Sequence, residues 1–231
     1  MLLNHSITRD DLAAIIFEAR QKQSNTSPEL TSELKRLELR HPSGWSILKN
    51  GTRSIVGSHT LSDKSKAVLK YYYPKNFFKK LNYRVTGSRC EMSWIAGLTF
   101  QRLGIPTPTP LYLSEKVSMF GLLNSQSFLA TRQFEGISLS TLPPERWANV
   151  TDQLKEVFQY FRQHHIAHGD LKASNILVSE QDQISFIDLD ATRFLLSGKD
   201  WEQAHQADLQ RFRRNWDGRP DAAEIFNSCI S

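Results

Sequence analysis

Residues 168–175 read His-Gly-Asp-Leu-Lys-Ala-Ser-Asn, and residues 187–190 read Ile-Asp-Leu-Asp. Together they form the pattern H-x-D-L-x-x-x-N, followed 13 residues after Asn175 by an aspartate at the end of a short apolar run. A single His, Asp or Asn in a loop most often only caps a turn. Two carboxylates, an amide and a lysine at this spacing instead predict a site for an anionic ligand and a divalent cation.

Phosphoryl transfer requires this set of groups, because the donor is highly anionic and the acceptor hydroxyl must be oriented and deprotonated. Protein-kinase-like enzymes use the same layout. We therefore interpret Asp170 as the carboxylate that orients the acceptor. Lys172 is placed to reach the γ-phosphate of ATP, and Asn175 and Asp188 offer oxygen ligands to Mg²⁺.

Three residues upstream are candidates for binding the nucleotide. Lys70 lies in the apolar run Val68 to Tyr71, where a lysine is costly to bury without a function, and we expect it to contact the α- and β-phosphates. Glu91 is the only acidic residue between Asp63 and Glu115, which makes it the default partner of Lys70; an exposed glutamate in the first turn of a helix is the alternative. Gly51 lies in the turn where a phosphate-covering loop is expected, although no G-x-G-x-x-G is present.

The pattern upstream of residue 134 predicts helices followed by an antiparallel sheet. Residues 8–40 are helical in pattern, with Thr8 as a cap, and we treat residues 1–40 as an N-terminal extension without an assigned role. Short β-branched runs, an Asn50-Gly51 turn and a helix ended by Gly104 follow. The predicted strands cover 45–48, 54–56 and 67–72, a stretch around Leu111, and 127–131, and the helix covers 88–103.

The remainder of the chain is mainly helical in pattern. Gly136 marks a junction, and the predicted elements beyond it are a helix over 147–164, strands over 175–178 and 184–187, and a helix over 202–216. The fold class is therefore α+β: a protein-kinase-like, two-lobed fold with a five-stranded antiparallel N-lobe that carries one helix (41–134) and a shortened, mainly helical C-lobe (135–231), with ATP between the lobes.

Composition excludes a disordered, a collagen-like and a coiled-coil chain. Apolar residues make up 39% and charged residues 23% of the 231 residues, as in ordinary globular proteins. No apolar run approaches the roughly 20 residues of a membrane span, and the N-terminus lacks the pattern of a secretory signal. Two cysteines, Cys90 and Cys229, fit a reducing compartment, so we expect a cytoplasmic protein.

From about Trp45 to the C-terminus, the chain resembles the lipopolysaccharide kinases of Gram-negative bacteria, the Kdo/WaaP-type family, in its InaA-like branch. The resemblance rests on Leu103 to Pro108, His168 to Asn175, Ile187 to Ala191, Asp208 to Phe212, and Asn215 with Trp216. It implies an ATP-dependent kinase that phosphorylates a sugar hydroxyl, Kdo or heptose, of the lipopolysaccharide inner core at the cytoplasmic face of the inner membrane.

Carried over to this chain, the resemblance makes Asp170 the catalytic base, Asn175 and Asp188 the Mg²⁺ ligands, and Lys70 the phosphate-binding lysine. Asp190 stands where eukaryotic-type kinases have the glycine of D-F-G. The chain departs from the family at one position, because the family's helix glutamate, counted back from Gly104, falls at Ser93 rather than at Glu91. Residues 1–40 lie outside the resemblance.

A basic block separates the predicted third strand from the helix. Residues 64–89 contain eight Lys and Arg and no acidic residue, and residues 71–80 interleave aromatics with lysines. The block suits an anionic lipid surface or a phosphorylated glycolipid, or else it is a solvated loop whose aromatics pack on the N-lobe. Binding of a nucleic acid would require only positive charge, and we do not expect a nucleic-acid partner.

Two alternatives to a lipopolysaccharide kinase remain open. His-Gly-Asp is shared with small-molecule phosphotransferases of the aminoglycoside and choline type, and Lys172 argues against them. A degenerate kinase fold that binds lipid or nucleotide without turnover is the second alternative; the missing glycine-rich loop favours it, and the complete set Asp170, Lys172, Asn175 and Asp188 argues against it. Ala207 follows Asp188 by only 19 positions, which leaves no room for the activation segment of a protein kinase.

Overall fold

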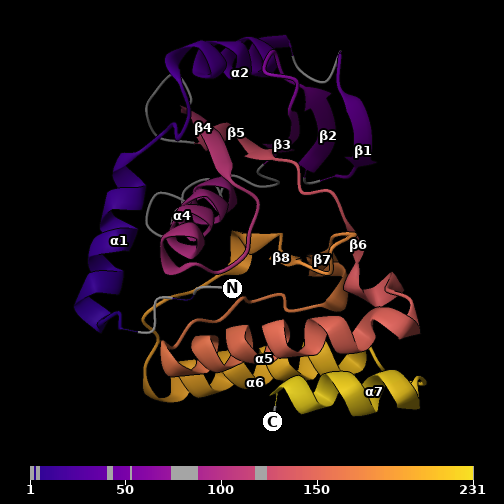
Figure 1. The fold of residues 1–231 in the computed structure, drawn as a ribbon. Coiled ribbons are helices and arrows are strands. Elements are labelled where there is room, and N and C mark those ends of the chain that lie inside the picture. Colours follow the sequence, from indigo (N-terminus) through magenta and orange to yellow (C-terminus); the bar gives the residue numbers. More distant parts are fainter. Residues whose placement is uncertain are drawn as a thin grey trace. The chain divides into compact units, whose positions relative to one another are not determined.

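A computed structural model describes residues 3, 6–40, 44–52, 54–73, 88–117 and 124–230 (Figure 1). The chain divides into two compact units. One contains residues 18–98 and 108–133 and is called the sheet unit; the other contains residues 1–17, 99–107 and 134–231 and is called the helical unit.

The sheet unit is built on five antiparallel strands in the order β1-β2-β3-β5-β4. The strands are β1 (Ser46–Asn50), β2 (Ser54–Thr60), β3 (Lys66–Tyr72), β4 (Pro110–Val117) and β5 (Asn124–Arg132). The Gly51 N–H donates to the Ser54 carbonyl oxygen at 3.0 Å and closes the first hairpin. The predicted five-stranded sheet is therefore confirmed.

Helix α2 (Pro28–Arg40) covers one face of this sheet (Figure 1). Leu30, Leu34 and Leu37 recur at helical spacing and are buried in one apolar cluster with side chains of the sheet. Within that cluster, the Trp45 ring stacks on Tyr71 with centroids 5.4 Å apart. Residues 18–40, which have no role in the sequence-based prediction, thus supply the apolar cover of one sheet face.

Helix α4 (Arg89–Leu103) begins and ends where the sequence predicts. Ser88 caps it, because its Oγ accepts from the Glu91 N–H at 3.0 Å. At its end, Gly104 has a φ of +77°, and the Ile105 N–H donates to the Phe100 carbonyl oxygen at 2.9 Å, which closes the helix as a glycine C-cap does.

Helix α1 (Arg9–Gln21) precedes α2. Thr8 caps it as predicted, since its Oγ1 accepts from the Asp11 N–H at 3.1 Å. Within the sheet unit, the carbonyl oxygen of Ala19 at its C-terminal end accepts from the Trp94 indole N–H at 3.2 Å, which ties α1 to α4.

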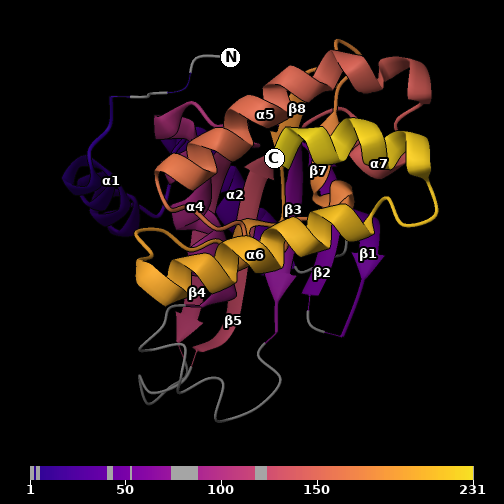
Figure 2. The same cartoon turned by 90° about the horizontal axis from the view of Figure 1, so that it is seen from below.

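Within residues 134–230, the helical unit combines helices with a small sheet. Its helices are α5 (Trp147–Gln163), α6 (Gly198–Arg214) and α7 (Pro220–Asn227), and its strands β6 (Ile137–Ser138), β7 (Ile176–Val178) and β8 (Ile184–Phe186) pair antiparallel in that order. Short 3₁₀ turns cover Leu139–Thr141, Pro144–Arg146, Ala173–Asn175, Leu189–Ala191 and Ser228–Ile230. Figure 2 shows α7 between α5 and α6.

Aromatic side chains fill the core of the helical unit. Phe158 of α5 meets Phe212 of α6 with ring centroids 5.0 Å apart, and Trp216 stacks on Phe226 of α7 at 4.3 Å. The predicted helix over 147–164 and both predicted strands are confirmed. Helix α6 begins four residues earlier than predicted, and α7 lies beyond the last predicted element, the helix over 202–216.

Candidate active site

The segment 168–175 forms a tight loop in the helical unit between α5 and β7. The Lys172 N–H donates to the Asp170 carbonyl oxygen at 2.8 Å, and the Asn175 N–H donates to the Lys172 carbonyl oxygen at 2.9 Å. Leu171 and Ala173 are buried, whereas Lys172 and Ser174 face solvent. Lys172 therefore projects from the loop into solvent, whereas Asn175 at the end of the loop is buried.

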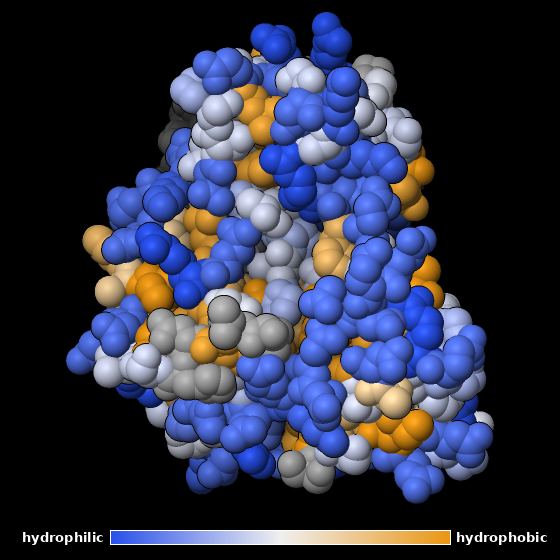
Figure 3. All heavy atoms as spheres, in the orientation of Figure 1, coloured by the Kyte–Doolittle hydropathy of each residue, from blue (hydrophilic) through white to orange (hydrophobic). Residues whose placement is uncertain are grey.

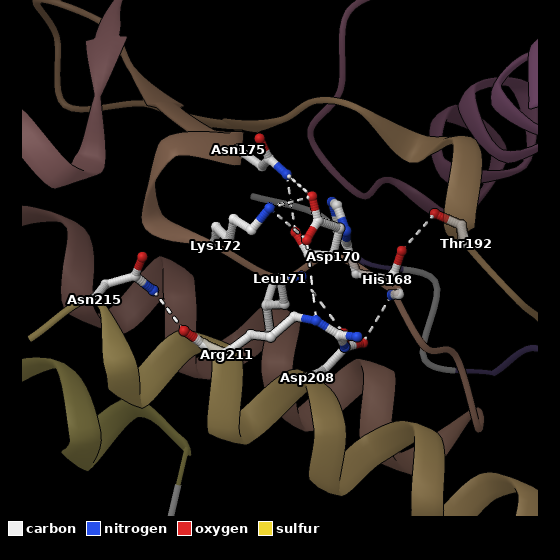
Figure 4. A network of polar contacts seen from close by, with 10 residues as sticks. His168, Asp170, Leu171, Lys172, Asn175, Thr192, Asp208, Arg211 and Asn215 are labelled. Atoms are coloured by element: carbon white, nitrogen blue, oxygen red, sulfur yellow. Dashed lines mark hydrogen bonds and ion pairs between the residues drawn. The ribbon is translucent and has the colours of Figure 1, made fainter. Parts of the chain in front are cut away.

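The Asp170 carboxylate is the centre of a polar network (Figure 4). The Lys172 ammonium lies 2.8 Å from each of its oxygens, and the Asn175 amide donates to Oδ2 at 3.1 Å. Arg211 of α6 brings its Nε to 4.0 Å from Oδ1. About a quarter of the Asp170 side chain is exposed, so a carboxylate flanked by three nitrogen groups is still open to solvent.

Asn175 is oriented by this network. Its Nδ2 donates to both the carbonyl oxygen (2.9 Å) and the carboxylate of Asp170, so its Oδ1 points away from Asp170 (Figure 4). The Ile187 N–H donates to the Asn175 carbonyl oxygen at 2.9 Å, which brings the segment before Asp188 alongside the loop. Asp188 follows β8 and adopts a left-handed conformation with φ of 59°.

The amide oxygen of Asn175 and the carboxylate oxygens of Asp188 are of the chemical type that Mg²⁺ prefers as ligands. An amide oxygen and a carboxylate are hard ligands, and Mg²⁺ in nucleotide enzymes is typically held by one or two carboxylates plus substrate phosphates. Within the described ranges, no group of three or more His, Cys, Asp or Glu side chains is arranged to hold a metal ion. The role of Asn175 and Asp188 as Mg²⁺ ligands stays a prediction from the sequence.

The carboxylate of Asp208 on α6 holds the loop through hydrogen bonds to its backbone. Its Oδ2 accepts from the Gly169 N–H at 3.0 Å, and its Oδ1 accepts from the Leu171 N–H at 3.4 Å and from Arg211 Nη1 at 3.4 Å. The carboxylate is 5% exposed, so these bonds compensate for its loss of water. The sequence-based prediction gave Asp208 no role; an acid on the apolar stripe of α6, beside Ala204, Leu209 and Phe212, was the available signal.

Gly169 is required by close packing. Its φ is +81°, and a Cβ at this position would lie 2.2 Å from the Ala191 carbonyl oxygen. No side chain fits there, which explains why this loop has His-Gly-Asp.

His168 is fully buried against the ring of Phe186, at 6.1 Å between centroids. Burial holds the pKa of His168 below its ordinary value, although the charges of Asp208, Asp188 and Asp170 oppose the shift. The backbone next to this buried ring is also held, because the Thr192 hydroxyl donates to the His168 carbonyl oxygen at 3.4 Å (Figure 4).

The three upstream candidates lie in the sheet unit. Lys70 is partly buried on β3, with its Nζ 4.8 Å from the centre of the Tyr72 ring. Burial raises the pKa of Glu91, the negative charge of Glu115 adds to the shift, and Arg20 opposes it. The Gly51 N–H is used within the hairpin. The roles assigned to these residues stay predictions.

Part of the basic block lies outside the described residues, since residues 74–87, with Lys75, Lys79, Lys80 and Arg84, are not among them. In the described ranges, no helix is long and apolar enough to cross a membrane. Large exposed apolar side chains there are Phe17, Leu39, Ile47, Leu48 and Ile137. On the face shown in Figure 3, hydrophobic residues form small areas separated by hydrophilic ones.

A family model matches residues 48–225 of this chain: the lipopolysaccharide kinase (Kdo/WaaP) family. The match spans both β1–β5 and the loop that carries Asp170. A search of curated proteins found no match.

Proposed function

Since this chain belongs to the lipopolysaccharide kinase (Kdo/WaaP) family, which implies kinase activity, we propose that it transfers the γ-phosphate of ATP to a sugar hydroxyl, Kdo or heptose, of the lipopolysaccharide inner core. The observation that carries the proposal is the Asp170 carboxylate, which is partly exposed and held by Lys172 at 2.8 Å. A general base must be accessible to the acceptor and fixed in direction, and Asp170 meets both conditions.

Asp170, Lys172 and Asn175 of the loop each have a proposed role. Asp170 orients the acceptor hydroxyl and takes its proton as the oxygen attacks phosphorus. Lys172 binds the γ-phosphoryl oxygens when the donor is present, and Asp208 and Arg211 keep the loop in place. Mg²⁺, held by Asn175 and Asp188, would neutralise charge on the β- and γ-phosphates. Lys70 is proposed as the lysine that binds the α- and β-phosphates.

The proposed acceptor places the reaction at an anionic surface. Lipopolysaccharide precursors are made at the cytoplasmic face of the inner membrane, so we propose peripheral contact with that face. The basic, aromatic-rich segment 71–80 supports this proposal by its composition. We propose no nucleic-acid partner.

The test is transfer of labelled phosphate from Mg-ATP to a panel of acceptors. The panel contains deacylated inner-core oligosaccharide, the intact glycolipid, an aminoglycoside and choline. The proposal predicts label on the core sugar and the glycolipid. Label only on the aminoglycoside or choline would indicate that the protein is a small-molecule phosphotransferase. Binding of ATP with no transfer to any acceptor would indicate a kinase fold that binds its ligand without turnover.

A further inference from the structure

The two oxygens of the Asp170 carboxylate have different surroundings. Lys172 Nζ and Asn175 Nδ2 both donate to Oδ2, at 2.8 and 3.1 Å. Oδ1 shares the Lys172 ammonium at 2.8 Å, and the next cationic group from it, among the described residues, is Arg211, whose Nε lies 4.0 Å away. A carboxylate oxygen accepts two hydrogen bonds. Oδ2 therefore has its two partners, and Oδ1 can accept one more.

The guanidinium of Arg211 is only loosely paired. Its Nη1 lies 3.4 Å from Asp208 Oδ1, and its Nε is too far from Asp170 Oδ1 for a hydrogen bond. The Asp208 carboxylate already accepts from the backbone N–H groups of Gly169 and Leu171. The Arg211 side chain is 39% exposed, and a guanidinium has five N–H donors. Arg211, which extends from α6 toward the loop in Figure 4, therefore has donors for a ligand.

Helix α6 holds this guanidinium beside the loop. Arg211 follows Asp208 by three residues, so the two side chains lie on the same side of the helix. The Arg211 carbonyl oxygen accepts from Asn215 Nδ2 at 2.9 Å, at the C-terminal end of α6. Because Asp208 binds the loop backbone on either side of Asp170, the guanidinium and the Asp170 carboxylate are positioned by the same helix.

The charges around this position balance. Asp170 and Asp208 contribute two negative charges, and Lys172 and Arg211 contribute two positive ones. An anionic substituent on the acceptor would meet both carboxylates as well as both cations, so these groups give it no net attraction. A neutral hydroxyl requires only a donor at hydrogen-bond distance, and its bond to a charged donor is a strong one. The donors of Arg211 therefore suit a hydroxyl better than an anion.

We propose that Arg211 is a specificity-determining residue that binds a second hydroxyl of the acceptor, on the carbon next to the one that is phosphorylated. The proposal rests on the proposed function, because it takes Asp170 as the base. The reacting hydroxyl donates to Asp170 Oδ1, and its neighbour accepts from Arg211. A hydrogen-bond acceptor and a donor 4.0 Å apart match two hydroxyls that stand side by side on a sugar ring. The substrate class is therefore a vicinal diol, whereas choline, with its single hydroxyl, can form only the contact with Asp170.

The first test compares acceptors in the transfer assay. The panel contains the methyl glycosides of Kdo and heptose and their monodeoxy analogues, each of which lacks one hydroxyl. The analogue that takes no label identifies the reacting hydroxyl, and an analogue that lacks a hydroxyl on a neighbouring carbon is the probe. With the wild type, kcat/KM for one such probe should be about 10- to 100-fold lower than for the parent sugar, as expected for the loss of a hydrogen bond to a charged group.

Arg211→Met removes the donors and keeps the aliphatic stem. Parent and probe should react equally well with this variant, at about the kcat/KM of the wild type for the probe. A merely structural Arg211 would slow both acceptors by the same factor and leave their ratio unchanged. Arg213→Met is the matched control, because Arg213 is exposed in the last turn of the same helix. It should keep the wild-type ratio, and circular dichroism establishes that each variant is folded.

The second test measures binding of the same sugars without nucleotide, by NMR titration. Removal of one hydroxyl should weaken binding to the wild type by about 10- to 100-fold and should have no effect on binding to Arg211→Met. This measurement requires no phosphate transfer. Discrimination by Arg211 in a protein that transfers no phosphate would therefore refute the proposed kinase reaction and leave the diol contact intact.

Three results overturn the proposal. Equal kcat/KM of the wild type for the parent sugar and for every analogue that keeps the reacting hydroxyl would mean that no second hydroxyl is bound. A ratio that persists in folded Arg211→Met would mean that another residue binds it. A wild-type protein that binds none of the sugars would overturn both the diol contact and the proposed acceptor.

Discussion

Replacing Asp208 by Asn should weaken both the fold of the helical unit and the reaction. The substitution keeps the shape of the side chain but leaves one oxygen where two accept from the Gly169 N–H at 3.0 Å and the Leu171 N–H at 3.4 Å. The new amide group faces one of these donors, which loses its partner inside the protein. A hydrogen bond to a buried charged group contributes about 1.5–3 kcal/mol, and the remaining bond is no longer charge-assisted. We therefore expect a loss of about 2–4 kcal/mol.

The effect on phosphate transfer follows from the position of the loop. Asp170 lies between the two backbone groups that Asp208 holds, so release of either N–H shifts the carboxylate relative to the acceptor. A displacement of about 1 Å typically costs about 100-fold in rate. Stability is measured by urea unfolding followed by circular dichroism, and transfer by the initial rate with labelled Mg-ATP.

The control for Asp208→Asn is Asp200→Asn. Asp200 is an exposed residue in the first turn of the same helix, so its replacement changes the net charge equally without touching the loop. It should alter unfolding by no more than about 0.5 kcal/mol. If Asp208→Asn is as stable and as active as Asp200→Asn, Asp208 does not hold the loop and the reasoning is refuted.

Three further substitutions test other parts of the structure. Burial raises the pKa of Glu91, so the folded protein holds this proton more tightly than the unfolded chain; the stabilisation is complete below the ordinary glutamate value of about 4.3 and is lost as the pH rises through the raised pKa. Glu91→Gln should therefore unfold at a higher temperature than wild type at pH 8, with the difference shrinking toward pH 4, and a gap independent of pH would contradict this. Gly169→Ala should lower the free energy of unfolding in urea by about 2–5 kcal/mol, because it combines left-handed strain with a clash against a backbone oxygen. Gly198→Ala is the control: it has the strain alone, with nothing within 4 Å of the added Cβ, and should lower the free energy of unfolding by about 1–2 kcal/mol. Leu34→Ala removes a fully buried side chain and should cost about 2–5 kcal/mol, and Leu39→Ala, 73% exposed on the same helix, should cost little; equal values would mean that α2 is not part of the core.

Much of the fold follows from local signals in the sequence. The Asn50-Gly51 turn, the alternation along β3 and the Gly104 C-cap each act through neighbouring residues, so pattern alone locates the sheet and α4. Membership of residues 18–40 in the sheet unit could not be predicted in this way. It depends on the contact of the α2 leucines with side chains of the sheet that lie far along the chain. Helix α7 has only eight residues, too few for a periodic pattern to be distinctive.

The candidate site likewise contains residues that the sequence places together and residues that only the fold brings together. Asp170, Lys172 and Asn175 lie within one loop, so their spacing carries the information that places them together. Asp208 reaches Gly169 of the loop from 39 residues further along the chain, and only the fold brings it there. The hydroxyl of Tyr72 on β3 lies 3.2 Å from the hydroxyl of Ser93 on α4, and this contact joins a strand to a helix across 21 residues. No rule of spacing links those two hydroxyls.

The most direct test of the account is the reaction of Asp170→Asn with the core oligosaccharide. Asp170 is proposed as the base that acts on the acceptor and not as a nucleotide ligand, so this variant should bind Mg-ATP with the affinity of the wild type. It should transfer phosphate to the sugar about 100- to 10,000-fold more slowly. Asp200→Asn, measured beside it, should transfer at the wild-type rate. Transfer by folded Asp170→Asn at a rate equal to that of the wild type would contradict the assignment of the base, and with it the chemical role given to the loop.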